Sequence, residues 1–125
     1  MLYDKSRLPA VPSCDEYVDA LQGMYQAGFI TANQYRMLIN HYHSPNHIIT
    51  ASDLADSVGY KSWSGANLQY GLFGKNLRDY MSYKGAGQES YVLAYFLPPD
   101  IDGNPEWLFI MHEEVAQALE VLGWV

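Results

Sequence analysis

The chain has 125 residues, of which 49% are hydrophobic, and a net charge of −7. This length predicts one domain that buries its own core. The single cysteine, Cys14, excludes an internal disulfide, and no apolar run is long enough to span a bilayer. The polar, proline-marked start is not typical of a targeting segment, so we expect a cytoplasmic protein.

The charge is distributed unevenly along the chain. Residues 1–60 carry three cationic and six acidic side chains, a balance of −3. Residues 61–84 carry four cations against one acid, a balance of +3, whereas residues 85–125 carry seven acids and no Lys or Arg. A basic middle segment is therefore followed by a strongly acidic one, and this asymmetry bears directly on which partners the chain can bind.

Two helices are predicted between residues 13 and 44. Ser13 with Glu16, and Thr31 with Gln34, are capping-box pairs, in which each side chain satisfies a backbone N–H of the first helical turn. Apolar residues follow each pair at helical spacing. Because the two helices are short and closely linked, we expect them to form an antiparallel hairpin.

Residues 50–83 predict a helix-turn-helix, around which the rest of the chain is organised. Thr50 with Asp53 starts a short helix, and Gly59 suits its end. A longer helix follows, beginning near residue 62 or 64 and running towards Tyr80. Its apolar positions repeat at intervals of three and four and predict one core face: Ala66, Tyr70, Phe73, Leu77, Tyr80 and Met81.

Two glycines, Gly71 and Gly74, lie inside this second helix, and each costs roughly 1 kcal/mol relative to Ala. Two interpretations give these glycines a structural role, and a third gives them none. Either another element or a ligand approaches the backbone there, or the helix breaks near Gly71. On the first interpretation Tyr70 is buried and Asn67 hydrogen-bonds local backbone.

The acidic segment predicts a β-hairpin and a last helix. Residues 90–97 and 106–111 are rich in β-branched and aromatic side chains, and the loop 98–105 between them is rich in turn residues. A helix then opens at His112 or Glu113 and ends at a glycine.

These elements together predict an α+β fold. It comprises two N-terminal helices, a helix-turn-helix, a β-hairpin wing and a C-terminal helix. Residues 1–12 form an arm, because Pro9 and Pro12 disfavour a helix, and residues 13–125 form a single winged-helix-like domain.

Two stretches have the residue types of metal sites. His41, His43 and His47 lie within seven residues, but histidines also suit a helix C-terminus, and no Cys or acid completes a ligand set in that run. The loop 100–104 has part of a calcium-loop pattern and lacks its terminal glutamate. Paired carboxylates in an apolar setting, a phosphate loop and a Ser-His-Asp signature are absent, so we expect no metal, no cofactor and no enzymatic activity.

One resemblance covers residues 30–125. The run ITASDLADSVGYKSWSGANLQYGLFGKNL, followed by WLFIM and ALEVLGWV, resembles a small bacterial and phage module found beside or fused to HNH endonucleases. The NLQYG core is its most specific part. The HNH motif itself is absent, so the resemblance implies phage, restriction or mobile-element biology and no nuclease chemistry.

The first functional interpretation is a DNA-binding winged helix-turn-helix, associated with an HNH nuclease or with transcription control. A helix-turn-helix and a local charge of +3 favour it. Amide side chains on the second helix suit adenine edges. The predicted contacts are Lys61, Asn67, Gln69, Lys75, Arg78 and Lys84.

The second interpretation, which we prefer, is a protein-binding module. An acidic wing is repelled by phosphates and attracted to a basic protein surface, and the many Tyr and Trp side chains suit an interface. In a phage or defence context, the partner would be a nucleic-acid enzyme, such as a CRISPR or restriction complex, that the module inhibits. The predicted contacts are Asp100, Asp102, Glu106, Glu113 and Glu114.

Overall fold

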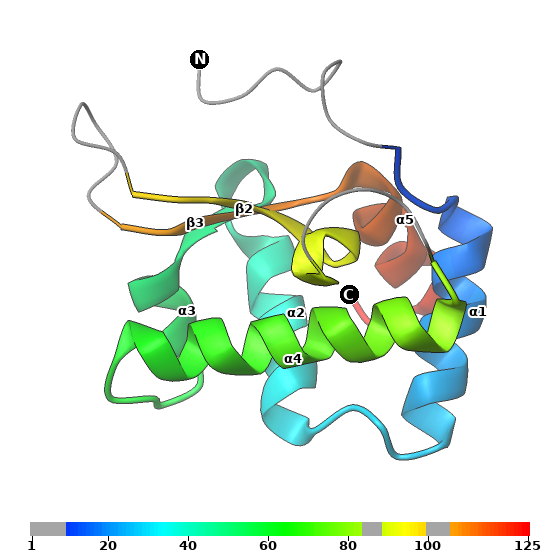
Figure 1. Ribbon diagram of the computed structural model, residues 1–125, viewed down its shortest axis with the longest axis horizontal. Coiled ribbons are helices and arrows are strands. Elements are labelled where there is room, and N and C mark those ends of the chain that lie inside the picture. Colours follow the sequence, from blue (N-terminus) through cyan, green and yellow to red (C-terminus); the bar gives the residue numbers. More distant parts are fainter. Residues whose placement is uncertain (1–9, 84–88, 100–105) are drawn as a thin grey trace.

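The computed structural model describes residues 10–83, 89–99 and 106–125, and in this part of the chain the fold is α+β (Figure 1). Five α-helices surround a small three-stranded antiparallel sheet within these ranges. The elements are α1 (Cys14–Gln26), α2 (Ala32–His43), the 3-10 turn η2 (Pro45–His47), β1 (Ile48–Thr50), α3 (Ala51–Ser57), α4 (Trp63–Met81), the 3-10 turn η3 (Glu89–Val92), β2 (Ala94–Leu97), β3 (Leu108–Met111) and α5 (Glu113–Leu122).

Both predicted capping boxes are confirmed. The Ser13 hydroxyl accepts from the Glu16 N–H at 3.3 Å, and the Glu16 carboxylate accepts from the Ser13 N–H at 3.1 Å. Thr31 and Gln34 make the same reciprocal pair, with both distances 3.0 Å. Local sequence therefore fixes where α1 and α2 begin.

The close packing expected of an antiparallel hairpin of α1 and α2 is not seen between these two consecutive helices. α1 packs mainly against α5 and α4 and contacts α2 little, because the apolar face of α5, including Val115 and Leu119, lies against it. The two helices approach each other through aromatic side chains near the end of α1 and the start of α2. Tyr25, Tyr35 and Trp124 form an aromatic cluster with centroid separations of 5.1 to 5.7 Å.

The predicted pairing of residues 90–97 with 106–111 is confirmed between β2 and β3, with Ala94 opposite Met111. The first part of that range is the η3 turn rather than a strand. A third strand was not predicted: β1 pairs with the other edge of β3, placing Ile48 opposite Ile110. The sheet order is therefore β1-β3-β2, with the last strand of the sequence in the centre.

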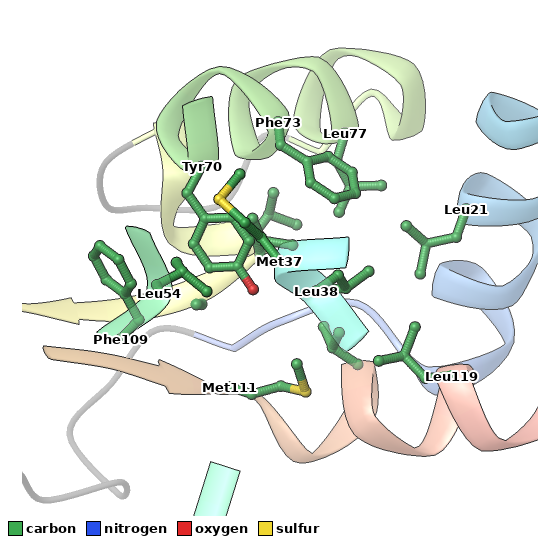
Figure 2. Close-up of a cluster of buried hydrophobic side chains, with 14 of the residues drawn as sticks. Leu21, Met37, Leu38, Leu54, Tyr70, Phe73, Leu77, Phe109, Met111 and Leu119 are labelled. Atoms are coloured by element: carbon green, nitrogen blue, oxygen red, sulfur yellow. The ribbon is translucent and has the colours of Figure 1, made fainter. Parts of the chain in front are cut away.

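The long helix α4 runs across the molecule in Figure 1, with α3 beside its first half and α1 beside its last turns. It is continuous from Trp63 to Met81, so the interpretation that it breaks near Gly71 is wrong. Its side chains Tyr70, Phe73 and Leu77 point into the core (Figure 2). No helix of the described residues is both long and apolar enough to cross a membrane.

Tyr80 departs from the predicted core face of α4. Its side chain is 46% exposed, although its spacing places it with the buried positions. The reason is geometric: α4 extends past the sheet, and its end lies beside α1 (Figure 1). Tyr80 therefore lies on α1 at the edge of the core.

The two α4 glycines differ, and opposite mutational effects follow. Gly74 is buried on the core side, whereas a Cβ built on Gly71 meets nothing within 4 Å. We expect Gly74→Leu to destabilise the protein by about 1–3 kcal/mol through overpacking. Gly71→Ala should stabilise it by about 0.5–1 kcal/mol through helix propensity. Urea unfolding measures both, and equal effects from the two positions would contradict this assignment.

Candidate binding surfaces

The acids predicted to bind a protein partner divide into three groups. Asp100 and Asp102 lie outside the described residues. Glu106 is half-buried, and its Oε1 accepts from the Ser52 N–H at 3.0 Å, so this carboxylate caps the first turn of α3. Glu113 and Glu114 form the first turn of α5.

The first turns of α1 and α5 each carry two acidic residues. Tyr17 of α1 is buried, and its hydroxyl donates to the Val92 carbonyl at 2.5 Å. Burial raises the pKa of this phenol, and the nearby carboxylates of Glu114 and Glu16 raise it further. Carboxylates from the first turns of both helices therefore contribute to the raised pKa of this one phenol.

The residues predicted to contact DNA are spread along α4 rather than gathered. Lys61, before the helix, and Lys75 are exposed. Arg78, in the last turn, is half-buried, and its Nε donates to the Tyr83 carbonyl at 3.3 Å. At 1.5 Å per residue the three cations span roughly 25 Å. Asn67 and Gln69 are half-buried, and Lys84 lies outside the described residues.

The outward face of α4 is apolar at its centre. Leu68 is 61% exposed and Leu72 is 41% exposed, and the two lie one helical turn apart. Gly71 beside them leaves the helix backbone open. Exposed leucines beside an open backbone are typical of a protein contact, whereas phosphate contact needs cations.

The three clustered histidines have separate environments. His41 is buried between the Tyr70 hydroxyl and the Phe109 carbonyl, each at 2.8 Å. Since a carbonyl only accepts, Nε2 donates to Phe109 and Nδ1 accepts from Tyr70. Burial lowers the pKa of His41 to about 4. His43 is exposed, and His47 bonds the Tyr42 carbonyl at 2.6 Å.

Because their environments differ, the three histidines do not act as one group. His41 is a neutral hydrogen-bonding residue that connects α2, α4 and β3. No group of three His, Cys, Asp or Glu side chains in the described ranges is placed to hold a metal ion.

Sequence reasoning missed a groove between α1 and α4. It has two adjacent hollows of about 440 Å³ and 370 Å³, and Tyr80 lines both. The first is also lined by Met24, Phe29, Asn76 and Asp79, and the second by Glu16, Asp19, Ala20 and Met81. We call these two hollows together the Tyr80 groove.

A third hollow, of about 420 Å³, lies between α5 and the sheet. Glu113 and Glu120 line it together with Asn46 and His47. Glu120 also accepts a hydrogen bond from the Tyr42 hydroxyl, which raises the pKa of that phenol. This hollow is polar and acidic, and it contains one of the acids predicted from sequence.

The chain was compared with known proteins, and no family model, no curated protein and no solved structure matches it.

Proposed function

We propose that the chain is a non-enzymatic, winged-helix-like module that binds the basic surface of a nucleic-acid-processing protein, in a phage or defence context, and inhibits it. The element order α2, β1, α3, α4, β2, β3 supports the winged-helix-like assignment. The strand order β1-β3-β2 adds to it, since a hairpin follows a helix-turn-helix and an earlier strand completes the sheet.

The outward face of α4 is the observation that carries the proposal. In a DNA-binding helix-turn-helix, this face of the second helix enters the groove and contacts bases and phosphates. Here it presents Leu68 and Leu72 at its centre, with Lys75 and then Asp79 beyond them. Leucine side chains lose their water readily when they pack against a protein, but they carry no charge that could contact a phosphate.

Charge supplies the second support, because it selects the kind of protein partner. Acidic residues in the first turns of α1 and α5 lie at the protein surface, and the net charge of the chain is −7. Such a distribution accelerates association with a basic surface and opposes association with nucleic acid. Proteins that process nucleic acids carry basic surfaces of this kind.

DNA binding is the alternative, and one pair of measurements separates the two. A partner recovered from the native host is titrated against the protein, and duplex DNA is tested in a mobility assay at low salt. We expect Asp100→Asn with Asp102→Asn, or Glu113→Gln, to slow association with the partner at low salt and to matter less at high salt.

Lys75→Ala with Arg78→Ala is the matched control, since it removes two cations of α4 and leaves every acidic side chain in place. We expect it to leave partner binding within about twofold. DNA binding at roughly 1 μM or tighter, abolished by this control pair and indifferent to the acids, would overturn the proposal in favour of DNA.

A further inference from the structure

We propose that the Tyr80 groove binds an arginine side chain, together with an adjacent apolar side chain, of the partner protein. This inference deepens the proposed function and rests on it, because it assigns a site and a chemistry to the basic partner.

The Tyr80 ring stands between the two hollows of the groove. One hollow is lined by Met24 and Phe29, at and beyond the end of α1, and the other by Glu16 and Asp19, nearer its start. Both include Tyr80. The ring therefore presents a surface to each hollow, and its side chain is 46% exposed.

The ring is held in place by a glycine on the facing helix. A Cβ built on Gly23 would lie 2.2 Å from the Tyr80 hydroxyl oxygen, so the phenol rests directly against α1 here, and any larger residue would push the ring aside. The ring of Phe29, itself 57% exposed, meets Tyr80 nearly edge-on, with centroids 6.5 Å apart and planes at 72°. A partly exposed ring with a defined orientation is a preformed contact.

The two hollows differ in chemistry, and this difference specifies the occupant. The second hollow joins the ring to the carboxylates of Glu16 and Asp19. No Lys or Arg is among the described residues lining either hollow. A guanidinium group stacks on an aromatic ring and pairs with carboxylates at the same time, which a compact ammonium group does less well.

The first hollow accommodates the neighbouring apolar side chain. Met24 and Phe29 supply apolar walls there, and Asp79 lies at its side. An acidic hollow and an apolar hollow on one ring fit two side chains of one chain segment better than a single small cation. The occupant is therefore a basic segment of a protein, in keeping with the net charge of −7.

The test uses the peptide acetyl-Gly-Arg-Leu-Arg-Leu-Gly-amide as the probe, titrated into ¹⁵N-labelled protein. We expect saturable amide shifts at Gly23, Phe29 and Tyr80. Citrulline in place of both arginines removes the charge and keeps the shape, and we expect it to weaken binding about tenfold or more. Lysine in place of both arginines should weaken binding less.

Two variants test the groove itself. Gly23→Ala pushes the exposed Tyr80 ring aside, and it replaces a helical glycine, so binding should fall about tenfold while the thermal midpoint does not fall. Tyr80→Ser should weaken binding similarly, and Tyr80→Phe should retain it. Val121→Ser, which changes an exposed apolar side chain of α5 outside the groove, is the matched control and should leave peptide binding unchanged.

Three results would overturn the inference: no saturable shift, shifts confined to the hollow at Glu113 and Glu120, or full binding by Gly23→Ala. Failure here is distinguishable from failure of the proposed function. If the groove variants have no effect while the recovered partner still responds to the acids, only the groove is wrong. If the peptide binds the groove while DNA binding requires Lys75 and Arg78, the groove stands and the proposed function falls.

Discussion

Phe73→Ala is expected to destabilise the protein by about 3–5 kcal/mol, whereas Leu72→Ala at the adjacent position should cost less than about 1 kcal/mol. Phe73 is fully buried and meets the Tyr70 ring at a centroid distance of 6.5 Å. Removing it leaves a cavity at the centre of the cluster in Figure 2. Leu72 is exposed on the opposite face of the same helix, so its loss opens no cavity.

Urea unfolding followed by circular dichroism measures this contrast. The free energy of unfolding of an ordinary domain is about 5–15 kcal/mol. The urea concentration at the midpoint of unfolding should therefore be much lower for the Phe73 variant. Similar midpoints for the two variants would show that α4 is not oriented as described.

Acidification is expected to remove about 3 kcal/mol of stability between pH 6.5 and pH 4 through His41 alone. The unfolded chain titrates this histidine near its ordinary pKa of 6.5, while burial lowers the folded pKa to about 4. The folded state therefore binds the proton less well than the unfolded state. The contribution of neutral His41 is fully present above pH 6.5 and is lost as the pH falls towards 4.

His41→Gln isolates this effect from the protonation of carboxylates. The glutamine amide can still donate to the Phe109 carbonyl and accept from the Tyr70 hydroxyl, the two bonds that His41 makes. The difference in unfolding free energy between the wild type and this variant should shrink as the pH falls. His43→Gln is the control, because His43 is exposed. A pH-independent difference for His41→Gln would contradict the assignment.

Elements specified by neighbouring residues could be predicted from sequence. The capping boxes at Ser13 and Thr31 act over three residues, and the hairpin of β2 and β3 shows in two runs of β-branched and aromatic residues. Gly123 ends α5 with a positive φ of 73°, as expected for a glycine after the last apolar turn.

Features that depend on distant partners could not be predicted. β1 has only three residues, Ile48–Thr50, and its pairing with β3 is set by the fold, although three consecutive β-branched residues were a weak signal. The groove depends on Tyr80 meeting Gly23 of another helix. A glycine within α1 carried no indication of which ring rests on it.

The central position of β3 has a consequence for how the chain acquires its structure. Both neighbours of this strand, β1 and β2, precede it in sequence, and the Phe109 carbonyl that His41 requires belongs to it as well. During synthesis, the earlier helices emerge without the strand that joins them. Long loops must close before these contacts form, so completion of the sheet is a late event. A truncation that removes β3 abolishes the whole sheet rather than one edge.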